Sequence, residues 1–204
     1  MNQTPLGPAD LKIYREAAAA ALLWHFRLHP RPISSESEDV PDHAHGEIAF
    51  GAMVSHGPVS FPPGTSMEGA ERFWSANLYK AEAAALLAVA PREAERRALA
   101  RSAGGGARLS DLGPTERGTL ARAAEALGVH DRQTWFQEIR MKIDRLFDDP
   151  LVWNGVEVLV TAARGRGALS DHEVEHFLER AGTPRTPWPD WMPGSSPNFD
   201  FYFD

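Results

Sequence analysis

Two histidines and a glutamate near the end of the chain have a spacing that suits metal-assisted hydrolysis. His172, Glu173 and His176 belong to the stretch HEVEH. Residues four apart on a helix share a face, so two neutral imidazoles at this spacing can converge on one Zn²⁺ ion. The Glu173 carboxylate would then act as a general base toward the attacking water. The pattern predicts a zinc-dependent hydrolase as one alternative, with Glu173 as its catalytic residue.

The HEVEH stretch is similar to the HExxH motif of zinc metallopeptidases, but its neighbours favour a capped surface helix. The motif helices of those enzymes pack inside the protein and carry uncharged variable positions, whereas Glu175 lies between the two histidines here. Ser170 and Glu173 have the spacing of a capping box, which places His172 in the first turn, at the positive end of the helix dipole. The helical wheel puts both histidines opposite the apolar stripe, so we expect them to face solvent. The stripe consists of Val174, Phe177, Leu178 and Ala181.

A zinc site would need a third ligand from elsewhere in the chain. Cysteine is absent from the sequence, so histidines and carboxylates would have to supply every ligand. Glu179 falls on the face of the two HEVEH histidines. His43 and His45, in DHAHGE, are two apart and would align on one side of an extended backbone. The polar context of DHAHGE favours a solvated loop, so the primary prediction has no cofactor and zinc remains the alternative.

The segment 162–173, AARGRGALSDHE, resembles the twelve-residue loop of an EF-hand. Gly167 stands at the sharp turn, Leu169 at the apolar position and Glu173 at the twelfth position. Positions one, three and five, which should supply carboxylates, hold alanine, Arg164 and Arg166. The resemblance therefore implies a helix–loop–helix without calcium, and the alternative is a chance match, because Gly-x-Leu-Ser often precedes a helix.

The middle of the chain is its only basic part. The whole chain has a net charge of −7, but residues 71–145 hold thirteen Lys and Arg against ten Asp and Glu, a balance of +3. A nucleic-acid contact is the third functional alternative, because clustered arginines attract phosphates. Glu93 and Glu95 partly neutralise the cluster and favour an ordinary solvated face. The arginines concerned are Arg92, Arg96, Arg97 and Arg101.

The segment PNFDFYFD at 197–204 alternates aromatic and acidic side chains. An extended backbone would place three phenylalanines on one side and Asp200, Tyr202 and Asp204 on the other. Peptides of this kind dock in a groove of a partner by aromatic anchors or strand addition. The alternative is a segment that folds back over the protein's own core. The predicted partner-binding residues are Phe199, Phe201, Tyr202 and Phe203.

Hydrophobic periodicity and capping signals predict a mainly α-helical domain over residues 1–182 with six or seven helices. Residues 30–65 form an irregular Pro/Gly-rich excursion with a possible short β-hairpin, in which EIAFGAMV could be a strand. Residues 183–204 form an extended tail. Pro91 predicts a break between two helices. Residues 151–163 fit a strand or a helix, and their length favours the helix. The predicted helices span 8–29, 66–90, 91–103, 114–127, 132–147, 151–163 and 170–181.

Together these features predict a non-enzymatic interaction or accessory protein that binds a macromolecular partner, most simply a protein. The binding surface would consist of the helical surface and the aromatic–acidic tail. The sequence contains no apolar run near eighteen residues, so we expect a cytoplasmic protein that does not enter a membrane. The oligomeric state is left open between a monomer and a homodimer, because the first helix is apolar nearly all the way round.

Overall fold

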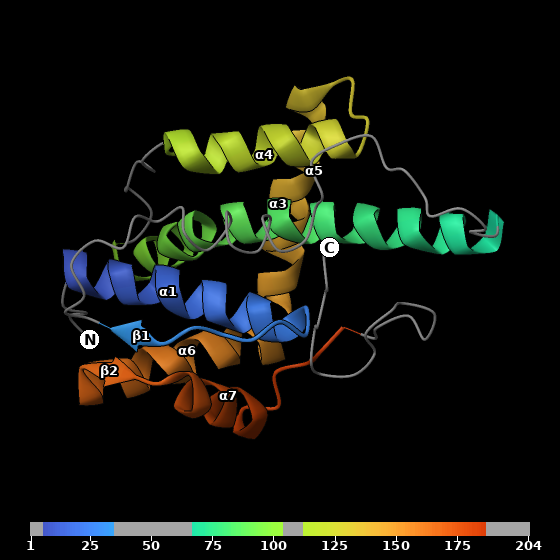
Figure 1. The fold of residues 1–204 in the computed structure, drawn as a ribbon. Helices are drawn as coiled ribbons and strands as arrows, with labels where there is room; N and C mark the ends of the chain where they lie inside the picture. Colours follow the sequence, from blue (N-terminus) through green and yellow to red (C-terminus); the bar gives the residue numbers. More distant parts are fainter. Residues whose placement is uncertain (1–5, 35–66, 104–111, 187–204) are drawn as a thin grey trace.

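The computed structural model describes residues 6–34, 67–103 and 112–186 of the chain, without the side chains of 67–80, 102–103 and 115. This part is mainly helical, which confirms the predicted fold class (Figure 1). The six helices are α1 (Pro8–His25), α3 (Met67–Ala103), α4 (Pro114–Ala126), α5 (Arg132–Asp148), α6 (Pro150–Arg166) and α7 (Asp171–Arg180). The strands β1 (Ile33–Ser34) and β2 (Ala168–Leu169) form one small sheet.

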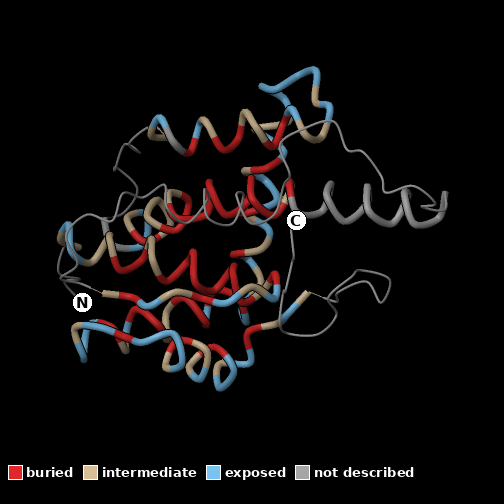
Figure 2. Tube along the Cα trace, in the orientation of Figure 1, coloured by how far each residue is buried: buried red, intermediate tan, exposed pale blue. Residues whose placement is uncertain are grey.

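Helices α1 and α3 form the centre of the fold. All eight residues from Ala17 to Trp24 are buried, as expected for a helix that is apolar nearly all the way round. Helix α4 packs on α3, α6 packs on α1, and α5 crosses between them with contacts to α3, α4 and α6 (Figure 1). Figure 2 shows the resulting core as buried stretches on the faces that these helices turn toward one another. Because much of α1 and α3 is buried, a surface that could bind a ligand or partner must draw mainly on α4 to α7 and on the accessible side of α3.

The predicted break at Pro91 is wrong, because α3 is one helix of 37 residues with Pro91 inside it. A proline removes one backbone hydrogen bond and costs about 3 kcal/mol in an isolated helix interior. From 81 to 91 every residue except Glu82 is buried, and α3 contacts α1, α4 and α5. Tertiary packing on several sides therefore outweighs the local cost, and the separate helix predicted for 91–103 is the second half of α3.

The ambiguous segment 151–163 is helical and forms most of α6, as its length indicated. The Asp149 side chain caps the helix by accepting a hydrogen bond from the Leu151 N–H at 2.9 Å, and Pro150 occupies the first turn. Val152, Val156 and Val160 recur every four residues and are all buried. These three valines thus form the inner stripe of a helix.

A strand pairing and two hydrogen bonds join distant segments whose contact was not predicted from the sequence. In the antiparallel sheet Ile33 lies opposite Leu169, and both side chains are 1% exposed. Beyond α7, the Trp24 indole N–H donates to the carbonyl of Thr183 at 3.1 Å, and the Thr186 N–H donates to the carbonyl of His25 at 2.8 Å. Residues 183–186 are thereby attached to the end of α1. The possible strand EIAFGAMV and the tail from 187 lie outside the described residues.

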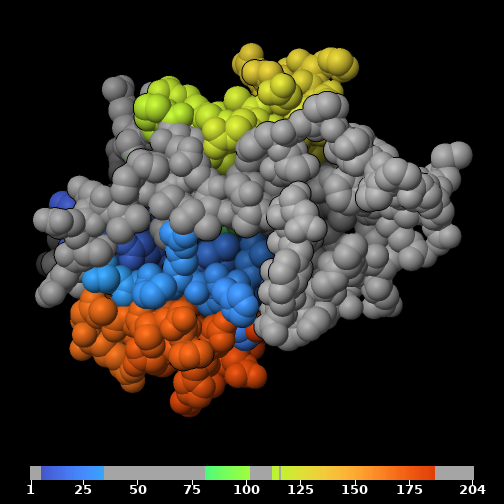
Figure 3. All heavy atoms as spheres, viewed as in Figure 1, coloured from blue at the N-terminus to red at the C-terminus, as the bar shows by residue number. Residues whose placement is uncertain are grey.

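Each helix in the described part of the chain lacks the long apolar run that a membrane crossing requires. Figure 3 shows α6 and α7 as one continuous surface below a band formed by α1 and β1, with α4 and the start of α5 as a ridge on the other side of that band.

Candidate functional site

The two histidines of HEVEH lie on α7 and face outward, as the helical wheel predicted. His172 and His176 are exposed, whereas Val174 and Leu178 are fully buried on the opposite side. Ser170 and Glu173 form the predicted capping box, in which the Glu173 carboxylate accepts from the Ser170 N–H at 2.9 Å. This hydrogen bond and the nearby Arg166 lower the pKa of Glu173. The carboxylate is thus held at the helix start.

The described residues contain no cluster of three or more histidine, aspartate and glutamate side chains that could hold a metal. Glu179 is exposed on α7 and is not part of such a cluster. His43 and His45 lie outside the described residues. The part of the chain that the structure describes therefore brings no third ligand to His172 and His176.

The segment that resembles an EF-hand loop does form a helix–loop–helix. Helix α6 ends at Arg166, Gly167 follows with a φ of 81°, and α7 starts two residues after the short strand. The left-handed backbone at Gly167 is the turn for which the sequence pattern required glycine. Arg166 donates to Glu173 at 2.6 Å, so the positive charge beside the carboxylate at the twelfth position is a guanidinium of the loop itself.

The four central arginines proposed for nucleic acid are engaged with carboxylates of the protein itself. Each makes at least one ion pair, and three of these pairs join α3 to α5 or α6. A guanidinium held in this way contributes little net charge to a phosphate backbone. The pairs are Arg92 with Glu95, Arg96 with Glu93 and Asp144, Arg97 with Asp148, and Arg101 with Glu157.

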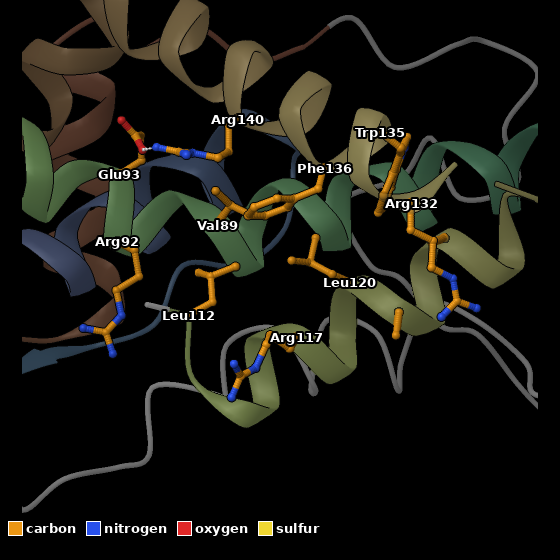
Figure 4. A pocket seen from close by; sticks show the side chains of 12 residues that line it. Val89, Arg92, Glu93, Leu112, Arg117, Leu120, Arg132, Trp135, Phe136 and Arg140 are labelled. Carbon is orange, nitrogen blue, oxygen red and sulfur yellow. Dashed lines mark ion pairs between the residues drawn. The ribbon is translucent and has the colours of Figure 1, made fainter. Parts of the chain in front are cut away.

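In the described part of the chain, a pocket of about 430 Å³ lies between α3, α4 and α5, and we call it the α3–α5 pocket. Its apolar side chains point toward a common centre in Figure 4, with Val89 from α3, Leu120 from α4 and Phe136 from α5. Leu112, just before α4, Ala121 and Ala124 of α4, and Trp135 also belong to the apolar lining. The volume lies within the usual range of ligand sites, about 300–1,000 Å³.

Four arginines contribute to the edges of the α3–α5 pocket, and two of them are available to a ligand. Arg117 on α4 and Arg132 on α5 are exposed, and neither has a side-chain hydrogen bond or ion pair to another described residue. Figure 4 places their guanidinium groups at separate edges of the apolar centre. By contrast, Arg92 is engaged with Glu95 and Arg140 with Glu93. The site therefore offers two uncommitted cations around an apolar middle.

Among the described residues that line the α3–α5 pocket, Glu93 is the one carboxylate, and it is 3% exposed. Burial raises its pKa, and the hydrogen bond from Arg96 opposes that shift. Its second oxygen lies 3.7 Å from Arg140 (Figure 4). Glu93 is thus enclosed by two guanidinium groups, an arrangement that fixes the arginines in the wall of the pocket.

The pocket was missed at the level of sequence, although its signal is present there. In the sequence, Trp135 and Phe136 belong to the apolar stripe of the predicted helix 132–147, which explains them as core residues. Arg132, Phe136 and Arg140 are spaced by four residues and so share one helical face. Two arginines that flank an aromatic ring on one face indicate a site for an apolar ligand with acidic groups.

Comparisons with known proteins give no identification for this arrangement. The chain matches no model of a protein family, and it matches neither a curated protein nor a solved structure. The function must be argued from the site alone.

Proposed function

We propose that this chain is a non-enzymatic interaction protein that binds an aromatic and acidic segment of a protein partner in the α3–α5 pocket. The observation that carries the proposal is the pair of uncommitted arginines, Arg117 and Arg132, at separate edges of an apolar cavity. Aromatic side chains of the partner would fill the cavity lined by Val89, Leu120 and Phe136. Acidic side chains on either side of them would bind the two guanidinium groups.

The separation of the two arginines favours a peptide segment over a small anion. A single carboxylate or phosphate would need both guanidinium groups at one point, whereas Arg117 and Arg132 come from different helices and lie at different edges (Figure 4). A segment with acidic residues on both sides of its aromatic anchors satisfies both. Trp135 adds an aromatic surface near Arg132, of a kind that is enriched at protein interfaces.

The lining favours binding over catalysis. Among its described residues, no serine, threonine, histidine or cysteine is present to act as a nucleophile or base. The carboxylate of Glu93 is bound to Arg96 and faces Arg140, so it has no free position from which to take a proton from a substrate.

The test is a fluorescence-anisotropy titration of the full-length protein with the labelled hexapeptide FDFDFD. We expect saturable binding, whereas FKFKFK, with reversed charges, and SDSDSD, without rings, should not bind. Replacing Arg117 and Arg132 together by serine should weaken binding at least about tenfold, since each charge-assisted contact contributes about 1.5–3 kcal/mol and 1.4 kcal/mol is a factor of ten.

The matched control replaces two other exposed arginines, Arg145 on α5 and Arg180 on α7, by serine. This variant loses the same charge but leaves the α3–α5 pocket intact. We expect it to bind FDFDFD like the unmodified protein. Equal weakening in both variants would show a nonspecific charge effect. Failure of FDFDFD to bind both the unmodified protein and a variant with serine at 199, 201 and 203 would refute the proposed function in this form.

A further inference from the structure

We propose that residues 198–204, NFDFYFD, occupy the α3–α5 pocket of their own chain and compete there with the segment of a partner. The inference rests on the proposed function, because it concerns the regulation of the same site. It assigns to the pocket an internal occupant, which a partner must displace before it can bind.

The chemistry of the segment matches that of the pocket. NFDFYFD contains four aromatic residues and two aspartates, and Asp200 and Asp204 flank the aromatic run from Phe201 to Phe203. The pocket offers an apolar middle between Arg117 and Arg132. Residues 146–204 hold four Lys and Arg against ten Asp and Glu, a balance of −6, whereas 71–145 have a balance of +3. Within that basic part of the chain, the exposed guanidinium groups of Arg117 and Arg132 are the charges that attract the two aspartates of the segment.

The connection to the fold is long enough. The Thr186 N–H donates to the carbonyl of His25, and Thr186 lines a second hollow that Leu146 of α5 also lines. From Leu146 back to Phe136, α5 advances about 15 Å at 1.5 Å per residue. Residues 187–197 contain four prolines among eleven residues, and an extended chain of that composition spans roughly 34 Å at 3.1 Å per residue. That length covers the distance along α5 and the path around the helix.

Attachment to the same chain makes even a weak segment an effective competitor. A short tether gives an intramolecular ligand an effective concentration on the order of millimolar. A partner present at micromolar concentration then binds only if its segment fits better or if the internal segment is weakened. The site is therefore closed to weak ligands and open to matched ones.

The first experiment compares FDFDFD binding to the full-length protein with binding to a variant in which Phe199, Phe201 and Phe203 are serine. We expect the variant to bind the peptide at least about tenfold more tightly, because its internal competitor has lost its anchors. Met192→Ser removes an apolar side chain from the same part of the sequence and should leave the affinity unchanged. Equal affinity of the triple variant and the unmodified protein would overturn the inference.

The second experiment does not depend on the hexapeptide. A photoreactive benzoylphenylalanine replaces Phe201, and mass spectrometry locates the cross-link in monomer and dimer bands. Cross-links to α4 or to 132–140 within the monomer support the inference. Cross-links elsewhere, or only between two copies, overturn it. Cross-links at the pocket without any FDFDFD binding would refute the proposed partner but keep the internal occupant. Cross-links elsewhere, together with equal affinity of the triple variant and the unmodified protein for the peptide, would refute the internal occupant but keep the proposed partner.

Discussion

Arg166 and Glu173 form an ion pair of 2.6 Å that joins the end of α6 to the first turn of α7. The same carboxylate accepts from the Ser170 N–H at 2.9 Å, so its oxygens are committed to the helix–loop–helix. A general base of a zinc hydrolase must instead face a metal-bound water. The sequence HEVEH is therefore explained by the capping of α7, and this explanation leads to the first prediction.

Replacing His172 and His176 by alanine should alter neither the zinc content nor the stability of the purified protein, because both side chains are exposed. The free energy of unfolding should stay within about 0.5 kcal/mol. Ser170→Ala removes the cap and should lower it by about 1 kcal/mol. Denaturant titration and metal analysis by mass spectrometry measure both effects. Stoichiometric zinc that disappears in the double-histidine variant would establish the alternative that we have set aside.

The close packing of α6 against the segment after α7 depends on Gly155. A Cβ atom there would collide with the Thr183 side chain and lie 3.1 Å from a methyl group of Leu178. Gly155→Ala should therefore lower the free energy of unfolding by about 1–3 kcal/mol. Gly165→Ala, in the same helix with open space around it, should raise that free energy by about 0.5–1 kcal/mol. Denaturant titration checks the pair, and equal effects of the two changes would contradict the packing described.

Tyr14 reports on the junction of α1, α3 and α6. Burial and the negative charge of Glu157, whose carboxylate accepts from the Tyr14 hydroxyl at 3.0 Å, raise the pKa of Tyr14 to about 12. Because the folded protein keeps this proton where the unfolded chain loses it, stability should fall as the pH rises from 10 through 12. Glu157→Gln should bring the pKa below 12 but leave it above 10, since burial remains. Absorbance titration of the tyrosinate tests this, with Tyr14→Phe to assign the signal.

Binding of FDFDFD should weaken as salt rises, because the two guanidinium groups that receive its acidic residues are exposed and the Debye length shortens from about 10 Å at 0.1 M to about 3 Å at 1 M. The variant with serine at 117 and 132 should show a flatter dependence than the control with serine at 145 and 180. Titrations at several salt concentrations provide the comparison. An affinity for FDFDFD that does not change with salt concentration would mean that the two arginines do not contact the peptide.

The helices could be predicted because their signals are local. The Asp131 cap is one such signal: this aspartate directly precedes the predicted helix 132–147, and its side chain accepts from the N–H groups of Gln133 and Thr134 at 3.1 Å. The exposure of the HEVEH histidines followed from the wheel in the same way. At Pro91 the local rule failed, because packing of α3 against three helices is a property of the whole fold.

The pocket and the sheet could not be predicted, because both bring together distant parts of the chain. Ile33 pairs with Leu169, and Val89 of α3 lines the same pocket as Phe136 of α5. No periodicity within one element encodes these arrangements. The uncommitted state of Arg117 and Arg132 also depends on where the carboxylates of other helices end up. The excess of arginine in the sequence indicated instead residues whose charge is neutralised by a carboxylate in the structure, as that of Arg97 is by Asp148.

The most direct test of the account is the indole N–H resonance of Trp135 in ¹⁵N-labelled protein during addition of FDFDFD. Trp135 lines the α3–α5 pocket, whereas Trp153 is buried against Phe147 and Tyr14. Trp135→Phe and Trp153→Phe variants assign the two signals. We predict that the Trp135 resonance shifts in a saturable manner and that the Trp153 resonance stays in place. A stationary Trp135 signal while the peptide binds would place the binding site elsewhere and contradict the account.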